Sequence, residues 1–285
     1  MEPKGIAMTN FSELATEGRN LNAANIDKMN ALEIARCINQ EDQTVALAVE
    51  RCLPQVAEGI ELFAGALRAG GRVFYCGAGT SGRLGVVDAS EIPPTYGLTD
   101  RVIGLMAGGY SAIVHPSEDA EDDETSLSTV LREEYAFGEN DLLIAISASG
   151  SAACVKGALR YARERGAKTV CISCNRNSDL IPLADLAIIA EVGPEVISGS
   201  TRMKAGTAQK MILNMLSTGG MVRYGRVRGN YMAYMVPSNR KLVARAVRMI
   251  CQKTGCTPER AEAELEKANN VIADAMDAIE AGQAQ

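Results

Sequence analysis

Hydrophobic residues fall along the chain in two kinds of pattern. Short continuous runs of apolar, β-prone residues occupy positions 73–76, 102–106, 141–147, 168–173 and 186–190. Runs of this length are typical of strands that are buried on both faces of a parallel sheet. Most of the segments between them carry apolar residues at helical spacing. The pattern predicts an α/β fold in which helices cover a doubly wound, parallel five-stranded sheet.

Helical spacing also extends to both sides of this series. Residues 27–67 have the apolar spacing of successive helices, and the segment from residue 254 onward has the pattern of a small helical hairpin. Between the leader and these helices, the polar, glycine-containing segment TEGRN at 16–20 needs a partner surface to be ordered. We expect an N-terminal arm with helices at 1–58, an α/β domain at 59–225 and a small helical C-terminal region at 226–285.

The first predicted strand runs directly into the glycine-rich turn GAGTSG at residues 77–82 and then into a helix. Gly79 keeps the turn free of side-chain bulk, and the Thr80 and Ser81 hydroxyls stand where the first free N–H groups of the helix point. This combination predicts an anion site. The glycines also match the dinucleotide pattern G-x-G-x-x-G, but the next predicted strand ends in two glycines and lacks the acidic residue that holds a ribose. We therefore favour a phosphorylated sugar over a dinucleotide.

A second turn repeats this plan. The third predicted strand leads into SASGS at residues 147–151 and then into a helix. Because both turns follow parallel strands, they can converge on one ligand at the carboxyl edge of the sheet. Neutral hydroxyl donors suit an acidic protein that must bind a phosphate dianion. We predict that the phosphate is held by Thr80, Ser81, Ser147, Ser149 and Ser151.

Composition and charge narrow the kind of partner. The chain has 285 residues, of which 47% are hydrophobic, and a net charge of −6. The negative charge disfavours nucleic acid and anionic membrane surfaces as partners, and no apolar run has the length of a membrane span. The eight cysteines are scattered, several of them inside apolar runs, as is typical of a reducing cytoplasm. We expect a cytoplasmic protein that binds a small molecule.

Candidate acid–base groups are few. His115 is the only histidine, which argues against His-dependent triads and multi-histidine metal sites, so proton transfer falls to carboxylates, Lys or Tyr. Glu91 stands just before a Pro-Pro pair, at the end of the helix that follows the first turn. Glu121 lies in the acidic run 118–124, whose default interpretation is a solvated face.

A basic residue opens the long helix that is predicted to run to about residue 221. Lys204 stands in its first turn, where a positive charge opposes the helix dipole and asks for an anionic partner. We predict that Lys204 takes part in substrate binding. Its own chain offers no obvious anion, which favours a contribution from a second subunit.

Four stretches carry a resemblance to a known family: GAGTSGRLGVVDASEIPPTYG, EDAEDD, ISCN and VGPEVISGSTRMKAGTAQKMILNMLST. They resemble the N-acetylmuramic acid 6-phosphate etherases, which have the sugar isomerase (SIS) fold, and the similarity extends from TEGRN to SNRKL. It implies a lyase that cleaves N-acetylmuramate 6-phosphate to N-acetylglucosamine 6-phosphate and D-lactate, without a metal or cofactor. It also implies a cytoplasmic homodimer with a shared active site, acting in peptidoglycan recycling.

The resemblance implies roles for two glutamates. Glu91 matches the general acid of the DASE motif, and Glu121 matches the second catalytic carboxylate, in the EDD motif. Elimination needs a base for the C2 proton and an acid for the leaving lactate oxygen, after which water adds to the unsaturated sugar; two carboxylates in different environments suffice. We interpret Glu91 as the protonated group and Glu121 as the ionised one, with the opposite assignment left open.

One segment departs from the family pattern. Residues 151–154 are Ser-Ala-Ala-Cys where the family commonly has Arg-Thr-Pro-Tyr, and this is closer to other phosphosugar-binding relatives such as the glucokinase regulatory protein. A non-catalytic phosphosugar-binding regulator is therefore the alternative function. Glu91 and Glu121 favour the enzyme, because a regulator needs neither an acid nor a base. A sugar isomerase is disfavoured, because His115 is poorly sited for aldose–ketose proton transfer.

Overall fold

The computed structural model describes residues 14–117 and 119–283. Its centre is a sheet of five parallel strands in the order β2-β1-β3-β4-β5, which confirms the predicted fold class. The strands are β1 (Val73–Gly77), β2 (Val102–Met106), β3 (Leu142–Ile146), β4 (Lys168–Ser173) and β5 (Leu186–Ile189). The chain leaves β1 toward β2 on one side and returns to β3 on the other, so the topological switch point lies between β1 and β3.

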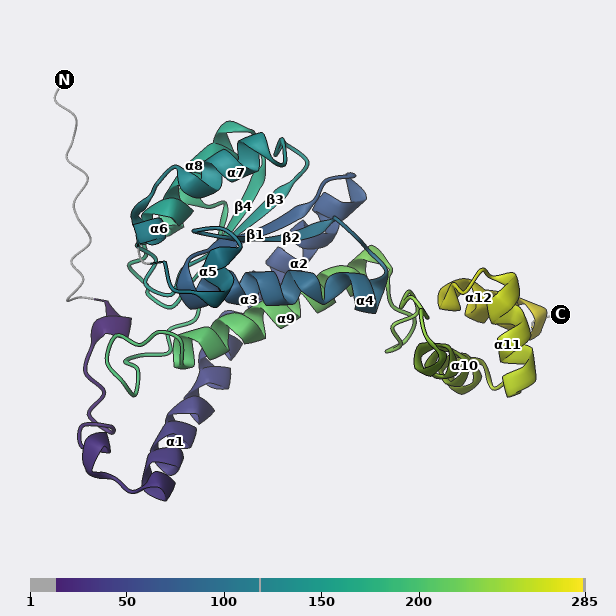
Figure 1. Ribbon diagram of the computed structural model, residues 1–285, viewed down its shortest axis with the longest axis horizontal. Helices are drawn as coiled ribbons and strands as arrows, with labels where there is room; N and C mark the ends of the chain where they lie inside the picture. The colour runs from purple at the N-terminus through teal and green to yellow at the C-terminus, as the bar shows by residue number, and fades with distance from the viewer. Residues whose placement is uncertain (1–13, 118, 284–285) are drawn as a thin grey trace.

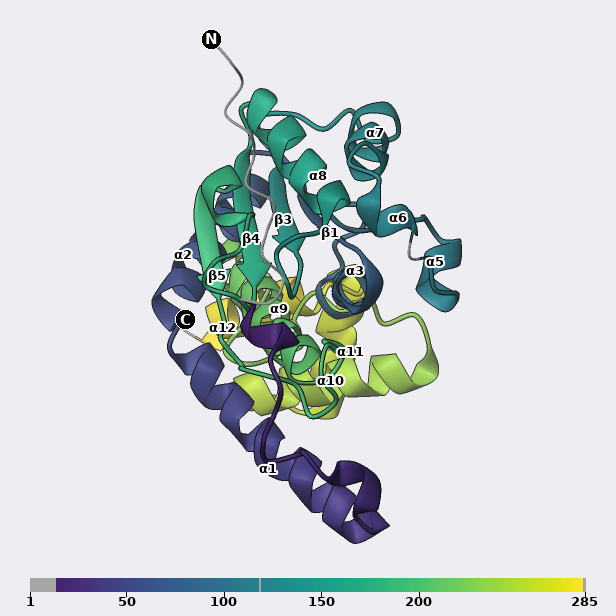
Figure 2. The ribbon, with the colours of Figure 1, turned by 90° about the vertical axis from the view of Figure 1, so that its left-hand side faces the viewer.

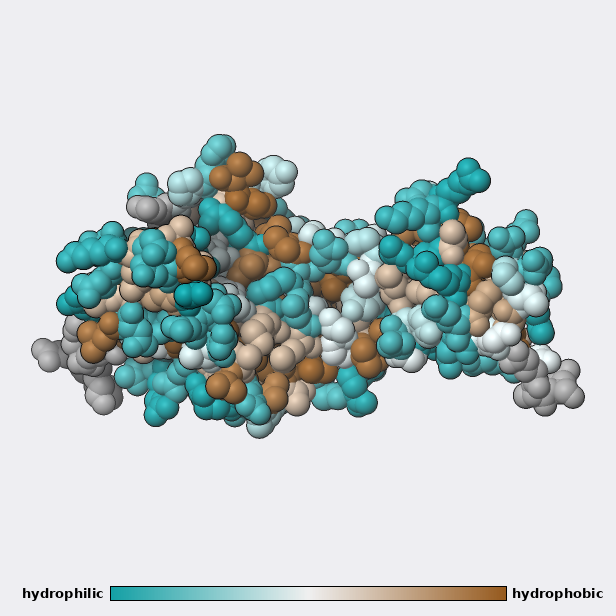
Figure 3. Space-filling model, turned by 90° about the horizontal axis from the view of Figure 1, so that it is seen from below, coloured by the Kyte–Doolittle hydropathy of each residue, from teal (hydrophilic) through white to brown (hydrophobic). Residues whose placement is uncertain are grey.

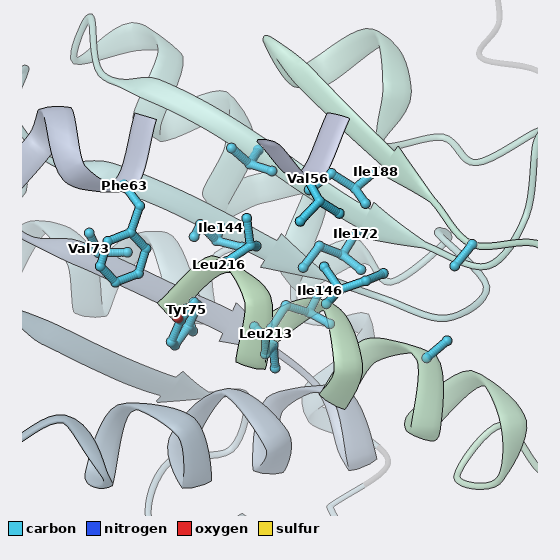
Figure 4. Packing of buried hydrophobic residues seen from close by; sticks show 14 of the residues in the cluster. Val56, Phe63, Val73, Tyr75, Ile144, Ile146, Ile172, Ile188, Leu213 and Leu216 are labelled. Carbon is cyan, nitrogen blue, oxygen red and sulfur yellow. The ribbon is translucent and has the colours of Figure 1, made fainter. Parts of the chain in front are cut away.

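One face of the sheet is covered by α2 (Leu53–Arg68) and α9 (Lys204–Tyr224), which pack against each other and enclose the larger hydrophobic core. Strands that are buried on both faces read as continuous apolar runs, which is why the sequence pattern predicted them. Figure 4 shows how side chains of the sheet meet those of α2 and α9 in this core. The labelled residues are Val56, Phe63, Val73, Tyr75, Ile144, Ile146, Ile172, Ile188, Leu213 and Leu216.

The opposite face is covered by α7 (Ser126–Glu133) and α8 (Ala153–Glu164), over a second core that includes Phe74 and Phe137. Helix α3 (Gly79–Ser90) packs on β1, β2 and α9 (Figure 1). Short elements connect these layers: α4 (Ile92–Tyr96), α5 (Ser111–Val114), α6 (Asp119–Asp122) and the 3-10 turn η4 (Ile181–Leu183). The α3 helix ends at Ser90, with Glu91 as its C-cap, as the sequence predicted.

The N-terminal arm projects from the body. It contains η2 (Ala15–Glu17), η3 (Ile26–Lys28) and the long helix α1 (Ala31–Glu50), which begins in a capping box between Asn30 and Glu33. The end of α1 buries Val45, Ala48 and Val49 against the body, whereas its beginning extends away from the body (Figure 2). Residues 14–22 turn back toward the carboxyl edge of the sheet, where Thr16 bonds to Asn175 and Asn20 bonds to Pro194, so the arm contacts the body at two places.

The C-terminal helices form a small core of their own, apart from the sheet (Figure 1). Besides the expected hairpin, formed by α11 (Pro258–Lys267) and α12 (Ile272–Gln283), the cluster includes α10 (Arg240–Thr254), which packs on both. The core is made of small and apolar side chains: Ala246, Ile250, Ala261, Leu265, Ile272, Met276 and Ile279. The unit is therefore a three-helix cluster.

Candidate active site

A small pocket of about 90 Å³ opens at the switch point, between the ends of β1 and β3. Both predicted turns line it, as does a loop that precedes α9. Among the described residues, Glu121 is the one with a charge in the lining. The hydroxyl-bearing residues of the lining are Thr80, Ser81, Ser147, Ser149 and Thr201. Ligands of open α/β sheets bind at such switch points, so the structure brings the two predicted turns and Glu121 together in one site.

Two helix N-termini meet at this pocket without a side-chain cap. Ala78 is the N-cap of α3 and Ala152 the N-cap of α8, and neither side chain satisfies the first N–H groups of its helix. Alanine is a poor N-cap residue, and uncapped N–H groups at the positive end of a helix dipole favour an anion. Gly82 permits the tight turn, because a Cβ there would lie 2.3 Å from the carbonyl oxygen of Gly77. The pocket therefore has the polarity of a phosphate site, although none of the described residues that line it is basic.

The serine turn is held open by its own hydroxyl groups. The Ser147 hydroxyl oxygen accepts a hydrogen bond from the Gly150 N–H at 3.1 Å, and its hydrogen remains free for a ligand. The Ser149 and Ser151 hydroxyl oxygens lie 2.8 Å apart, so one donates to the other and the pair keeps one hydrogen for a further acceptor. Gly150 adopts a positive φ of 80°, which glycine tolerates best. Ser151 thus reaches the site through Ser149.

Ser81 has a different environment. Its hydroxyl oxygen lies 3.0 Å from Oε1 of Gln209, a fully buried residue of α9. The Gln209 Nε2 atom is the one buried side-chain nitrogen or oxygen without a hydrogen-bond partner in the described part of the chain. In this arrangement Ser81 donates its hydrogen to Gln209. A half-turn of the carboxamide would place Nε2 against Ser81 and free the Ser81 hydrogen for a phosphate.

Glu121 lies on α6, beside the N-terminal turn of α8. The side chain keeps much of its surface exposed, yet protein atoms crowd its carboxyl group, and this burial, together with the charge of Asp122, raises the pKa of Glu121. Arg83 of α3 donates to the carbonyl oxygens of Ala112 and Ile113, at 2.8 and 2.9 Å, and so fixes the segment that leads to α6. A carboxylate with a raised pKa is a stronger base, as proton abstraction requires.

Glu91 does not line this pocket. It caps the C-terminal end of α3, whereas the pocket lies at the N-terminal end of that helix. A helix of 12 residues spans about 18 Å, so the two catalytic candidates are not brought together within one chain. Glu91 is exposed to solvent, as is Val87 one turn earlier on the same helix, at 48% exposure.

A buried network fixes the end of α3 that carries Glu91. The Tyr75 and Ser217 hydroxyls donate to the carboxylate of Asp88 at 3.0 and 3.2 Å, and the Lys210 ammonium lies at 3.5 Å. Burial raises the pKa of Asp88, although these partners favour its ionised form. The network ties α3 to α9 one turn before Glu91.

Lys204 does not line the pocket. Its side chain is 3% exposed, and its ammonium nitrogen lies 2.7 Å from Oε2 of Glu41 on α1. The expectation that its own chain offers no anion is therefore wrong. Because the ammonium already faces a carboxylate, a direct contact between Lys204 and substrate stays a prediction without structural support.

Sequence reasoning missed Thr201 and Gln209. Both belong to the long motif around α9, from which the sequence predicted Lys204 alone as a site residue. The sequence did contain one signal of the anion site: an alanine stands at the N-cap position of both α3 and α8. Because the alanine side chain cannot cap a helix, its presence there indicates that a ligand satisfies the first N–H groups. Gln209 gave no local signal, since its position in the site depends on how α9 packs on α3.

The described residues form neither a metal site nor a histidine-based site in the pocket. Within residues 14–117 and 119–283, no group of three or more His, Cys, Asp or Glu side chains is placed to hold a metal ion. His115 follows α5 and does not line the pocket. All eight cysteines are free. Of the described helices, none combines the length and the apolar character that crossing a membrane requires.

The fold and the pocket define a protein with a SIS domain. Two family models match the chain: the glucokinase regulatory protein N-terminal SIS domain over residues 55–163, and the SIS domain over residues 126–219. Among solved structures, the NanR protein of Vibrio vulnificus, in complex with ManNAc-6P, has a TM-score of 0.50 and 16% identity over 81% of this chain and 74% of its own. At that identity the likeness concerns the fold alone.

Curated relatives are more specific. A protein of Photorhabdus laumondii named N-acetylmuramic acid 6-phosphate etherase is 48% identical over 96% of this chain and 91% of its own length. A protein of Actinobacillus succinogenes with the same name is 49% identical over 92% and 86%. The chain belongs to the N-acetylmuramic acid 6-phosphate etherase family.

Proposed function

We propose that this protein cleaves the D-lactyl ether of N-acetylmuramate 6-phosphate and yields N-acetylglucosamine 6-phosphate and D-lactate. The observation that carries the proposal is the likeness to etherases over nearly the whole chain, together with a pocket that combines neutral anion donors with one carboxylate. The family name implies a role in recycling peptidoglycan sugars, and the free, mostly buried cysteines fit a reducing cytoplasm.

The pocket residues support a division of labour. The uncapped N-termini of α3 and α8 and the hydroxyls of Thr80, Ser147 and Ser149 bind the 6-phosphate. Glu121, whose pKa is raised by burial and by Asp122, takes the C2 proton as general base. Glu91 protonates the leaving lactate oxygen as general acid, and water then adds to the unsaturated sugar.

The position of Glu91 supports a homodimer with a shared active site. General acid and base must both reach the same sugar ring, within hydrogen-bond distance of the atoms they serve. Since α3 keeps Glu91 about 18 Å from its own pocket, we propose that Glu91 of the partner subunit completes each site. The exposed Val87 and Glu91 lie on one face of α3. Seen from below, the surface of the body carries hydrophobic residues among hydrophilic ones (Figure 3).

The non-catalytic alternative is not favoured. One matching model is that of a regulatory protein's SIS domain, but the curated relatives are named as etherases. Glu121 lines the pocket, where a protein that only binds a phosphosugar would have no use for a carboxylate. The isomerase alternative has no support from His115, which lies outside the pocket lining.

The experiment is to incubate the purified protein with N-acetylmuramate 6-phosphate and measure D-lactate. Wild type should release lactate and incorporate solvent deuterium at C2 of the product. Glu91→Gln and Glu121→Gln should each lower kcat by about 100-fold to 10,000-fold while still binding N-acetylglucosamine 6-phosphate. Glu262→Gln, an exposed residue of α11, is the matched control. Tight phosphosugar binding by wild type with no lactate release would establish the regulator instead.

A further inference from the structure

Residues 16–20 of the arm lie against the carboxyl edge of the sheet, near the candidate site. Thr16 is fully buried although it lies in a 3-10 turn of only three residues. Its backbone N–H donates to Oδ1 of Asn175 at 3.3 Å, and its hydroxyl oxygen accepts from Nδ2 of Asn175 at 3.0 Å. A polar residue near the start of the described chain is thus held by two hydrogen bonds inside the protein.

Asn175 connects this segment to the serine turn. Asn175 is 2% exposed and lies two residues after the end of β4. Its backbone N–H donates to the hydroxyl of Ser173 at 3.3 Å. The Nδ2 atom that contacts Thr16 also lies 3.0 Å from the carbonyl oxygen of Ala148 and 3.3 Å from that of Ser149. Because Nδ2 has two hydrogens for three acceptors, one hydrogen is shared between two of them. One buried carboxamide therefore joins three segments that are far apart in the sequence.

These bonds fix the orientation of the peptides that line the pocket. A trans peptide directs its C=O and its following N–H to opposite sides. The Ala148 and Ser149 carbonyl oxygens both accept from Asn175, and Ala148 accepts also from the Cys174 N–H and the Ser173 hydroxyl. The negative ends of these two carbonyl dipoles therefore point to donors of the protein. The N–H of Ser149 belongs to the same peptide as the Ala148 carbonyl and therefore points away from Asn175, and both residues line the pocket.

The arm also supports the loop that supplies Thr201 to the pocket. Asn20 donates through Nδ2 to the carbonyl oxygen of Pro194 at 3.3 Å. Glu195, the next residue, accepts from the Lys204 and Ala205 N–H groups at 2.9 Å and so anchors the start of α9. The segment 16–20 thus contacts the loop before α9 directly, and the serine turn through Asn175.

We propose that Asn175 and Thr16 are positioning residues for phosphate binding, and that the N-terminal arm is thereby part of the substrate site. Asn175 holds the serine turn in the form that presents N–H and hydroxyl groups to the 6-phosphate. Thr16 holds the Asn175 carboxamide in the orientation that directs Nδ2 to the turn. The inference rests on the proposed function, because it places the sugar phosphate in this pocket.

The decisive substitutions preserve size. Asn175→Asp replaces the donor Nδ2 with an oxygen, which repels the carbonyl oxygens of Ala148 and Ser149. Thr16→Val keeps the shape and the backbone N–H but removes the hydroxyl that receives Nδ2, whereas Thr16→Ser retains it. Asn177→Asp makes the same change of charge at an exposed position two residues further along and is the control.

The measurement is calorimetric binding of N-acetylglucosamine 6-phosphate to the full chain, with the kinetics of lactate release and the melting temperature alongside. Asn175→Asp should raise Kd and KM at least tenfold with a smaller change in kcat. Thr16→Val should raise them about threefold, as expected for one hydrogen bond, and Thr16→Ser and Asn177→Asp should match wild type.

Two results would overturn the inference in different ways. If wild type binds the phosphosugar and Thr16→Val and Asn175→Asp bind it equally well, losing only melting temperature, these residues have a structural role alone and the proposed function stands. If wild type itself does not bind the phosphosugar, the proposed function and the inference fail together. Should Asn175→Asp not fold, the pair Thr16→Val and Thr16→Ser decides.

Discussion

The ammonium nitrogen of Lys204 lies 2.7 Å from Oε2 of Glu41, and both residues are buried. The Oε1 atom of Glu41 accepts a second hydrogen bond, from Asn22 at 2.9 Å. Burial opposes ionisation of this carboxyl, but the hydrogen bonds from Asn22 and Lys204 outweigh it and lower the pKa of Glu41. The pair joins the projecting helix α1 to the start of α9, three residues after Thr201, which lines the pocket.

Removing one partner of this pair should destabilise the protein strongly. Lys204→Met leaves the Glu41 carboxylate buried without its cation, which typically costs about 3–5 kcal/mol of unfolding free energy. Urea unfolding at neutral pH measures the loss. Lys253→Met breaks a partly exposed pair with Glu280, whose atoms lie 3.1 Å apart, and should cost only about 0–1 kcal/mol. Equal losses in the two variants would mean that the Lys204–Glu41 pair contributes no more than a surface contact.

Substitution in the serine turn should weaken phosphate binding and leave the fold intact. Ser149→Ala removes the partner of the Ser151 hydroxyl and the acceptor of the Ser151 N–H. We expect Kd for N-acetylglucosamine 6-phosphate to rise about fivefold to tenfold, the effect of one or two hydrogen bonds. Ser128→Ala, which removes a hydrogen bond to the Thr125 carbonyl oxygen on α7, is the calorimetric control. Unchanged affinity in Ser149→Ala would exclude this serine from the site.

The activity of wild type should fall at acidic pH in a window set by Glu121. Burial and the charge of Asp122 raise the pKa of Glu121, so the base is protonated, and kcat/KM lost, as pH falls through a value above that of an ordinary glutamate. Asp122→Asn removes the like charge, lowers this pKa and should move the acidic limb to lower pH. Asp274→Asn, exposed on α12, should not move it. A limb that stays in place in Asp122→Asn would assign the titration to another group.

Mixing two inactive variants tests the shared site. If Glu91 and Glu121 of each site come from different subunits, a mixed dimer of Glu91→Gln and Glu121→Gln has one site with both glutamates and one site with neither. Random exchange makes half of the dimers mixed, and half of their sites complete, so about one quarter of wild-type activity should return. No recovery after verified subunit exchange, or an active monomer in sedimentation, would contradict the shared site.

Much of the fold could be predicted from the sequence, because the patterns that indicate strands and turns are local. Each strand is a short β-prone run, and each pocket turn is a glycine with neighbouring hydroxyls; both patterns depend on a few consecutive residues. Parallel pairing then places the ends of β1 and β3 side by side, which is why Thr80, Ser147 and Ser149 could be assigned to one site before the structure was known. The sequence also placed Glu91 at the end of the helix that follows the first turn, as the structure has it.

The tertiary structure alone decided which polar groups are partners. Lys204 meets Glu41 across 163 residues, Ser81 meets Gln209 across 128, and Thr16 meets Asn175 across 159. None of these pairs has a local signature, since a buried polar side chain must find a partner but its own sequence neighbourhood does not specify which one. The partner is set by how the helices and the arm pack on the sheet. That packing is driven by the burial of apolar surface over the whole fold, and because the hydrophobic effect is not directional, no local sequence pattern specifies which polar groups it brings together.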